Sequence, residues 1–391
     1  MKTVKLGIAG LGMGGVHARN ILDGKVRDVE LAALADTDSA RLAQFPKVRG
    51  FATADAMIAS GAIDAILIAT PHYFHTPIGI AALKAGLHVL VEKPVAVHKA
   101  DAGRLIAAHD AAHDAAHAGK KPVFGVVFNQ RTDPYYLKIR ELIRNGDLGE
   151  IRRVNWIATH WFRTEAYYAS SAWRATWAGE GGGVLLNQCP HNLDMLQWLF
   201  GLPSRVRAHA GFGRYHQIEV EDDVTAYIEF TNGATGIFIA STGEAPGTNR
   251  LEIAGERGRI VYEDEKIVFR QNATGMTRFS RTATEGFALP DTTDSTFAFP
   301  DHGPQHIGIL QNFADAILRG APLIAPAAEG LHSIEIANAM LMAAWTGENI
   351  PFPMDGQRYE QLLNQQIATS TIKKVRKTVP VTTDWQKSFR P

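Results

Sequence analysis

Three glycines near the start of the chain have the spacing of a loop that binds a pyrophosphate. Gly10, Gly12 and Gly15 directly follow a short apolar run and precede a segment with helical spacing. In such a loop the first glycine permits a tight turn, the second lets the backbone approach a phosphate, and the third allows close packing of helix on strand. The amino end of the helix adds unpaired N–H groups and a positive dipole. The pattern predicts a dinucleotide site.

An acidic residue stands where such a site needs one. Asp36 ends the second apolar run, about 20 residues after the glycine loop, which is the usual spacing in dinucleotide-binding domains. A carboxylate there can accept both ribose hydroxyls of NAD and repels the additional phosphate of NADP. Arg41 is nearby and leaves NADP open as an alternative to NAD. We assign to the cofactor Gly10, Gly12, Met13, Gly14, Gly15, Asp36, Thr37, Arg41, Thr70, Pro71, His75, Glu92 and Lys93.

A lysine ends the fourth apolar run. Lys93 follows Val89, Leu90, Val91 and Glu92, so it stands at the carboxyl end of a predicted strand, where open α/β sheets bind their ligands. Such a lysine is either a surface residue whose ammonium reaches water or a cation of the site. The spacing alone does not choose between the two.

A second segment with unusual chemistry begins at the triple glycine at positions 181–183. Apolar residues farther along predict a helix over Asn187–Phe200 with one buried face. This helix would place Asn187, His191 and Asp194 on one side. A histidine there can transfer a proton while a carboxylate orients it. A buried histidine with a purely structural role fits the pattern equally well.

Five short apolar runs, separated by stretches with helical spacing, make up the first third of the chain. Such runs fit parallel strands that are buried on both faces, and strands that alternate with helices form a doubly wound sheet. The runs are Val4–Ala9, Val29–Ala35, Ile63–Ala69, His88–Val91 and Val123–Val127. We therefore predict an α/β Rossmann domain over residues 1–128.

The pattern changes after residue 128. From Ile151 onward, segments rich in β-branched and aromatic residues are separated by turn pairs and not by helices. We predict an open, mostly antiparallel sheet in an α+β domain over residues 129–391, which binds substrate and mediates oligomerisation. Residues 272–303 are predicted to form a long loop, and long loops in compact domains are often functional.

Composition excludes several classes of function. The 391 residues include 40 Lys and Arg and 40 Asp and Glu, so no net charge draws the chain to nucleic acid or an anionic membrane. The single cysteine, Cys189, excludes an internal disulfide and fits a reducing compartment. No apolar run is long enough for a membrane span or a signal peptide. We expect a cytoplasmic protein without a metal, and we interpret His109, His113 and His117 as a solvated helix face.

The glycine loop, the triplet Glu92-Lys93-Pro94 and the segment from the triple glycine through Asn187 and His191 occur in the order and spacing of the Gfo/Idh/MocA oxidoreductases. The chain resembles this family over nearly its whole length. The resemblance implies NAD-dependent oxidation of a sugar, anhydrosugar, glycoside or cyclic polyol such as inositol, and assembly into homodimers or homotetramers. It also implies that Lys93 and His191 act on the hydroxyl that is oxidised.

Two residues depart from the family's pattern. Position 187 is usually aspartate, but Asn187 cannot take a proton, so the role of base falls on His191. Asn187 then either hydrogen-bonds a substrate hydroxyl or orients the histidine. His72 stands where many relatives have asparagine. We take Lys93, His191 and Asn187 as the catalytic residues, with Lys93 stabilising the alkoxide-like charge.

An aromatic segment before the triple glycine predicts a sugar-binding surface. Ring faces can lie against the apolar faces of pyranoses, and arginine donors fix hydroxyl oxygens. A subunit interface or a packed sheet face would also favour aromatic residues. The residues assigned to the substrate are Arg131, Trp173, Arg174, Asn187, His191 and His306.

Two other functions stay open from the sequence. One is an enzyme that keeps NAD bound and cleaves or isomerises a glycoside through a transient keto sugar, an alternative that the asparagine at position 187 leaves open. The other is a sensor of NAD or sugar without catalysis. A sensor has no need of both Lys93 and His191.

Overall fold

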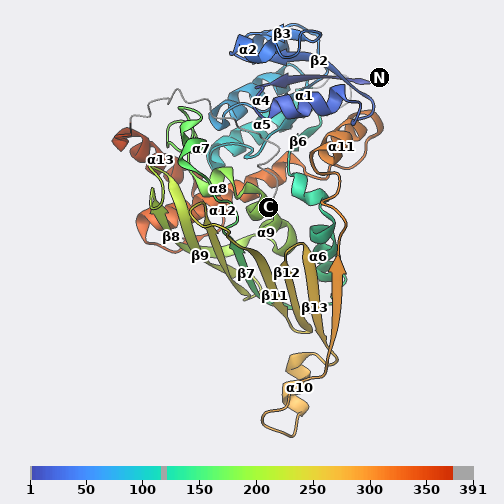
Figure 1. Cartoon of the computed structure of the whole chain (residues 1–391), viewed down its shortest axis with the longest axis vertical. Helices are drawn as coiled ribbons and strands as arrows, with labels where there is room; N and C mark the ends of the chain where they lie inside the picture. Colours follow the sequence, from blue (N-terminus) through green and yellow to red (C-terminus); the bar gives the residue numbers. More distant parts are fainter. Residues whose placement is uncertain (1, 116–120, 373–391) are drawn as a thin grey trace.

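The computed structural model describes residues 2–115 and 121–372 of the chain. Two β-sheets form its framework, one above the other in Figure 1. The upper sheet comes from the first third of the chain, and the lower sheet comes mainly from the middle, with its edges added later. Among the described residues, no helix has both the length and the apolar character that a bilayer crossing requires.

The first sheet has six parallel strands in the order β3-β2-β1-β4-β5-β6. The strand order reverses at β1, as in the doubly wound Rossmann fold, so the predicted fold of this half is confirmed. The strands are β1 (Val4–Ala9), β2 (Val29–Ala35), β3 (Arg49–Phe51), β4 (Ala65–Ile68), β5 (His88–Val91) and β6 (Phe124–Val126).

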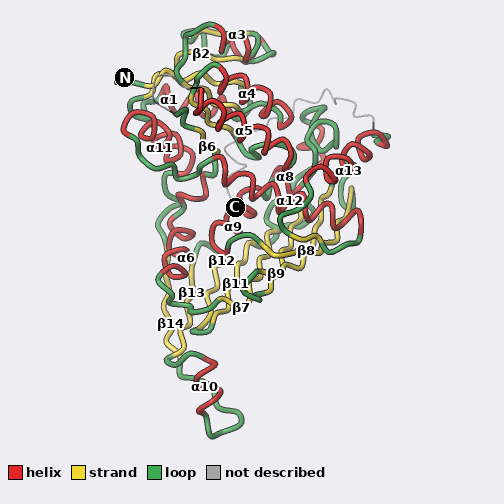
Figure 2. Tube along the Cα trace, turned by 180° about the vertical axis from the view of Figure 1, so that it is seen from behind, coloured by secondary structure: helices red, strands yellow, loops and turns green. Residues whose placement is uncertain are grey.

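Helices cover both faces of this sheet, which explains why its strands are apolar without alternation. One face receives a helix from far along the chain, because Ile309, Leu310 and Phe313 of α11 (Gln305–Arg319) join the core formed by Leu6 and Ile8 of β1. Figures 1 and 2 show this helix beside α1. The other helices of this half are α1 (Gly14–Leu22), α2 (Ser39–Leu42), α3 (Ala54–Ala59), α4 (His75–Lys84) and α5 (Lys99–Ala115).

The second sheet has nine strands in the order β14-β13-β12-β11-β7-β10-β9-β8-β15. All neighbours pair antiparallel except β7 with β10, so the mostly antiparallel sheet is confirmed. The strands are β7 (Ile151–Ala158), β8 (Pro203–Phe212), β9 (Glu221–Phe230), β10 (Thr235–Ser241), β11 (Asn249–Gly255), β12 (Gly258–Glu263), β13 (Lys266–Asn272), β14 (Thr292–Ala298) and β15 (Ile350–Pro351).

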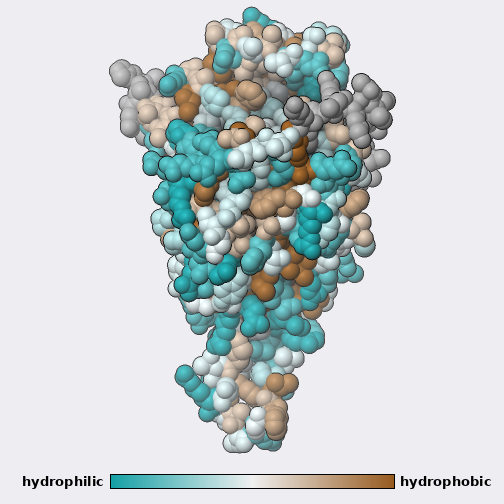
Figure 3. All heavy atoms as spheres, turned by 90° about the vertical axis from the view of Figure 1, so that its left-hand side faces the viewer, coloured by the Kyte–Doolittle hydropathy of each residue, from teal (hydrophilic) through white to brown (hydrophobic). Residues whose placement is uncertain are grey.

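The two faces of this sheet differ in what covers them. Trp156 and Phe238 are buried beneath the helices, whereas Tyr227, Ile237 and Val268 on the opposite face are 46%, 43% and 40% exposed. Figure 3 views the molecule from the left of Figure 1 and shows apolar residues along its middle with hydrophilic residues at the margins. The open face of the sheet therefore carries exposed apolar side chains among charged ones such as Arg207 and Glu252.

A long apolar helix joins the two halves. α12 (Ala327–Thr346) contacts α5 and β6 of the first half and α9 and β8 of the second. The predicted domain boundary after residue 128 stays a prediction, and the structure adds that α11 and α12 return to the first sheet. The remaining helices are α6 (Pro134–Arg144), α7 (Glu165–Ala169), α8 (Val184–Asn187), α9 (Pro190–Phe200), α10 (Met276–Thr282) and α13 (Gly356–Thr369), with short 3-10 turns at His72–Phe74 and Asn129–Thr132.

Two predictions of local structure were wrong. The helix predicted over Asn187–Phe200 begins only at Pro190, as α9, and Asn187 ends the separate helix α8, because Pro190 has no N–H to continue α8. The predicted loop at 272–303 contains α10 and the edge strand β14, which pairs with β13. Figure 1 shows α10 at the tip of an arm that projects from the bottom of the sheet.

Candidate active site

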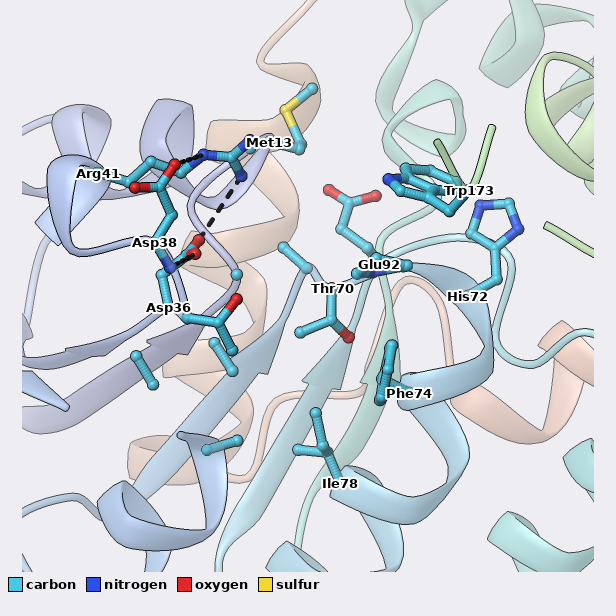
Figure 4. A pocket seen from close by; sticks show the side chains of 18 of the residues that line it. Met13, Asp36, Asp38, Arg41, Thr70, His72, Phe74, Ile78, Glu92 and Trp173 are labelled. Carbon is cyan, nitrogen blue, oxygen red and sulfur yellow. Dashed lines mark hydrogen bonds and ion pairs between the residues drawn. The ribbon is translucent and has the colours of Figure 1, made fainter. Parts of the chain in front are cut away.

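A cleft of about 630 Å³ lies at the carboxyl ends of the parallel strands, where an open α/β sheet binds ligands. Figure 4 shows Asp36, Asp38 and Arg41 on one side of it and His72 and Trp173 on the other. A second cavity of about 90 Å³ adjoins the cleft. Lys93 and Asn187 line both cavities, so the two spaces meet at these residues.

The glycine loop is shaped for close approach of a ligand. Gly10 has a φ of +88°, and a Cβ there would lie 2.6 Å from the carbonyl oxygen of Ala69. A Cβ on Gly12 would meet only Arg41, at 3.9 Å, and would project into the cleft that Gly12 lines. The close packing of helix on strand belongs to Gly14, where a Cβ would lie 2.7 Å from Ile8. This role was expected of Gly15.

Asp36 is fixed by the backbone of the loop. Its two carboxylate oxygens accept hydrogen bonds from the N–H groups of Leu11 at 2.7 Å and Asp38 at 2.8 Å. The guanidinium of Arg41 lies 3.6 Å from Asp36 and 3.5 Å from Asp38. The acidic pair therefore holds the guanidinium of Arg41 at this end of the cleft, which fits a ribose better than an additional phosphate.

Most of the predicted cofactor residues line the cleft. They are Gly10, Gly12, Met13, Asp36, Thr37, Arg41, Thr70, Pro71, Glu92 and Lys93. Gly14 and Gly15 are buried in the first turn of α1 and do not line the cleft. His75 is fully buried outside the cleft, where its two ring nitrogens contact the carbonyl oxygens of Thr70 and Pro94 at 2.8 Å each. It ties together the ends of two strands instead of facing the cofactor space.

Lys93 lies where the two cavities meet. Its Nζ donates a hydrogen bond of 2.7 Å to the backbone carbonyl oxygen of Asn187, which joins the first half of the chain to the second. Burial lowers the pKa of Lys93 from its usual value, although the charges of Glu92 and Glu180 oppose that shift. The ammonium is thus held beside both cavities.

His191 lines the smaller cavity together with Lys93 and Asn187. Burial, followed by the charges of Lys93 and His306, lowers its pKa well below the usual value. The imidazole is therefore neutral near pH 7 and able to accept a proton. Among the described residues, its buried Nδ1 has no hydrogen-bond partner.

Asp194 does not orient His191. Its carboxylate instead receives two hydrogen bonds from Arg131, at 2.6 and 2.8 Å. Arg131 also contacts Glu329 and the carbonyl oxygen of Ile324. Both side chains of the Arg131–Asp194 pair are fully buried, and neither lines the cavities. The structure thus removes Arg131 from the expected set of substrate residues and gives it a structural role.

The other predicted substrate residues reach the cavities. Trp173, Arg174 and His306 line the large cleft. His306 lies beside His17, with ring centroids 5.4 Å apart, and burial lowers its pKa to about 4. His72, which departs from the family's pattern, also lines the cleft and packs edge-on against Trp173.

The sequence did not single out two residues of the site, His17 and Glu180, whereas Tyr167 belongs to the aromatic segment that was expected to bind sugar. His17, on α1, contacts Glu92 at 2.7 Å. Burial opposes ionisation of Glu92, but the contact with His17 prevails and lowers its pKa to about 2. Glu180 and Tyr167 both contact the side chain of Asn187. The only sequence signal for Glu180 is its position immediately before the triple glycine.

The triple glycine serves packing and holds α8 in place. A Cβ on Gly181 would lie 2.2 Å from Val97, and one on Gly183 would lie 2.0 Å from the carbonyl oxygen of Glu221. The carboxylate of Glu221 accepts hydrogen bonds from the N–H groups of Gly183 and Leu185. Burial raises the pKa of Glu221 to about 7. This contact fixes the start of the helix that ends at Asn187.

Metal and thiol chemistry find no support in the described part of the chain. No group of three or more His, Cys, Asp or Glu side chains there could hold a metal. His109 contacts the carbonyl oxygen of Pro122, while His117 and the side chain of His113 lie outside the described residues. Cys189 is buried, and burial raises the pKa of its thiol.

Comparisons with protein families identify the chain. Residues 4–120 match the oxidoreductase family with an NAD-binding Rossmann fold, and residues 136–261 match the GFO/IDH/MocA C-terminal domain. The chain belongs to the Gfo/Idh/MocA family of oxidoreductases. Membership confirms the Rossmann fold, the oxidoreductase class and NAD as the cofactor. The glycine cradle and the acidic end of the cleft fit that cofactor.

Individual relatives are distant. Inositol 2-dehydrogenase of Rhizobium meliloti is 27% identical over 86% of this chain and 96% of that protein. Levoglucosan dehydrogenase of Pseudarthrobacter phenanthrenivorans is 30% identical over 52% of this chain and 56% of that protein. The solved structure of the WlbA dehydrogenase from Bordetella pertussis, in complex with NADH and UDP-GlcNAcA, matches with a TM-score of 0.75 at 26% identity, covering 90% of this chain and 100% of that one.

We predict that Arg131 contributes to stability and not to substrate binding. Removing one partner of a buried ion pair leaves the other charge unpaired and costs about 3–5 kcal/mol. Arg131→Met should lower the free energy of unfolding, measured by urea denaturation, by that amount, and the double variant Arg131→Met/Asp194→Leu should recover most of it. A variant of unchanged stability with a raised KM would show that Arg131 binds substrate.

Proposed function

We propose that the enzyme uses NAD to oxidise a secondary alcohol of a cyclic polyol, sugar, anhydrosugar or glycoside to the ketone, reversibly. The observation that carries this proposal is that Lys93 lines one cavity beside the cofactor cleft together with Asn187 and His191, which lie far from it in the sequence. The relatives named inositol 2-dehydrogenase and levoglucosan dehydrogenase support the substrate class.

His191 and Lys93 have different roles at the hydroxyl that is oxidised. His191, which is neutral near pH 7, takes the proton from the oxygen. Lys93 donates a hydrogen bond to the same oxygen and stabilises its developing negative charge, a contact that contributes roughly 3–4 kcal/mol. NAD supplies the acceptor for the hydride that leaves the carbon. The products are the ketone, NADH and a proton.

We propose that the rest of the substrate contacts residues around the junction of the two cavities. Trp173 offers a ring face, and Arg174 and His306 offer polar groups. Trp161 and Arg163 line the smaller cavity and can serve the far side of the sugar. The cytoplasmic location expected from the composition stays a prediction.

A screen of polyols, aldoses, anhydrosugars and glycosides tests the function. Each compound is incubated with NAD or NADP while absorbance of the reduced cofactor is followed. We expect NADH to accumulate with at least one cyclic polyol or sugar, and NAD to be preferred over NADP because Asp36 and Asp38 face the ribose end of the cleft. Release of a leaving group without NADH would select glycoside cleavage through a keto sugar instead.

Loss of the Lys93 ammonium should abolish most of the activity. With the substrate from the screen, Lys93→Ala is expected to lose at least about a hundredfold in kcat, because the charge on the oxygen is no longer stabilised. NADH binding, followed by fluorescence, should persist. Lys84→Ala, at an exposed lysine of α4, is the matched control. Full activity of Lys93→Ala would refute the assigned role.

The pH dependence should reflect the buried bases. Because the pKa of His191 lies well below its usual value and the neutral form is the base, kcat/KM should stay constant as pH falls from 8 to 6.5 and decline only in more acidic buffer. Because burial also lowers the pKa of Lys93, the alkaline decline should begin below that of a free lysine. An acid limb centred at or above pH 6.5 would exclude His191 as the base.

We propose that the open face of the second sheet pairs with a second copy of the chain in a homodimer or homotetramer. Tyr227 and Ile237 are neighbours on β9 and β10 and are exposed on this face, and apolar residues at a sheet centre favour burial. Sedimentation velocity should show an oligomer that Ile237→Glu dissociates. The control Leu137→Glu, on the exposed side of α6, should leave it intact. A monomeric wild-type protein would overturn this proposal.

A further inference from the structure

A buried carboxylate lies directly behind Asn187. The side chain of Glu180 is 1% exposed, and the groups that contact its oxygens are donors. The Asn187 amide donates to Oε1, the N–H of Ala175 donates to Oε2, and the guanidinium of Arg174 lies 3.8 Å from Oε1. Both oxygens of Glu180 therefore act as acceptors.

This arrangement decides which way the Asn187 amide points. An asparagine side chain has a donor end and an acceptor end, and only its NH₂ group can face a carboxylate that accepts. The carbonyl oxygen Oδ1 is turned the other way, toward the hydroxyl of Tyr167 at 3.4 Å. Because Asn187 lines both cavities, its acceptor end is available to a ligand there.

Tyr167 is oriented by the same network. Its hydroxyl oxygen accepts hydrogen bonds from Arg174 at 2.6 Å and from Gln188 at 3.2 Å. With those acceptor positions taken, the hydroxyl proton is directed to Oδ1 of Asn187. Glu180, Asn187, Tyr167 and Arg174 thus form a ring of contacts that Arg174 closes back onto Glu180.

We propose that Glu180 is the positioning residue that makes Asn187 a hydrogen-bond acceptor for the substrate. The backbone oxygen of Asn187 binds the Lys93 ammonium, and both residues line the two cavities, so a substrate held by Lys93 occupies the space that the Asn187 side chain lines. The substrate then carries a second hydroxyl next to the one that is oxidised, as in a vicinal diol, and donates it to Oδ1. This inference rests on the proposed function and narrows its substrate class.

In Glu180→Gln, the new side chain cannot accept hydrogen bonds from both the Ala175 N–H and the Asn187 amide. It has one acceptor and one donor, whereas the Ala175 N–H and the Asn187 amide both require acceptors. Either the Ala175 N–H is left unpaired, or Asn187 turns over and presents NH₂ to the substrate. Aspartate at position 187 fails for the opposite reason, because it places two carboxylates against each other. The exchange Glu180→Gln/Asn187→Asp satisfies every partner again.

The charged and titratable groups around Glu180 come from several elements. They are Arg174, Lys93, His72, Tyr168 and Glu221. A second carboxylate added here by Asn187→Asp faces the negative charges of Glu180 and Glu221. One carboxyl of the pair should then bind a proton in the folded state that it would not bind unfolded at the same pH. The free energy of unfolding of Asn187→Asp should therefore decrease as pH rises toward the raised pKa of that carboxyl.

The test compares the wild type, Glu180→Gln, Asn187→Asp and the exchanged double variant. With the best polyol of the screen, we expect Glu180→Gln and Asn187→Asp each to lose about tenfold or more in kcat/KM, the loss of one hydrogen bond to the substrate. The double variant should return to within about threefold of the wild type. The KM for NAD should not change in any of them. Glu165→Gln, at an exposed acid on α7, is the control.

A second measurement needs no substrate. The thermal midpoint of Asn187→Asp should fall between pH 5 and pH 8 by more than that of the wild type or of the double variant. A double variant no more active than Asn187→Asp, a fully active Glu180→Gln, or an Asn187→Asp midpoint with the wild-type pH dependence would overturn the proposal. Absence of any polyol oxidation by the wild type would refute the proposed function, and the pH dependence of the midpoint would still decide the pairing of Glu180 with Asn187.

Discussion

The hydrogen bond between the Lys93 ammonium and the Asn187 carbonyl is the contact on which the site depends. It spans from the end of β5 in the parallel sheet to the end of α8, above the second sheet. A buried ammonium is tolerable only when acceptors and opposite charges surround it, and here the Asn187 carbonyl oxygen is an acceptor and Glu92 and Glu180 provide opposing charge. This contact holds the end of β5 next to the end of α8, and the cofactor cleft and the smaller cavity meet at that point.

The surrounding structure keeps this junction rigid. Glu221 fixes the start of α8 through two backbone N–H groups, and the glycines at 181 and 183 let that turn pack against Val97 and β9. The Arg131–Asp194 pair anchors α9 to the turn that follows β6. Glu221 and the Arg131–Asp194 pair are themselves buried. The positions of Asn187 and His191 therefore follow from packing around these groups and not from contacts with the substrate.

The sequence predicted the elements better than the contacts between them. Buried parallel strands leave a continuous apolar signal, and the glycine loop, Lys93 and His191 stand in motifs with a recognisable spacing, so the fold class and the core of the site could be anticipated. Glu180, His17 and the true partner of Asp194 could not, because their partners lie far along the chain and no local pattern specifies which polar groups meet. The start of α9 at Pro190 could have been predicted locally, because proline favours the first position of a helix.

Cys189 gives the protein an internal reporter. It is the single thiol of the chain and stands immediately before α9, the helix that carries His191. Its side chain is buried, and burial raises the pKa of the thiol. Thiolate is the form that reacts with alkylating reagents, so labelling of the folded protein requires the segment around residue 189 to open. The rate of labelling therefore measures the free energy of that local opening, and a bound cofactor or sugar that holds α8 and α9 together will slow it.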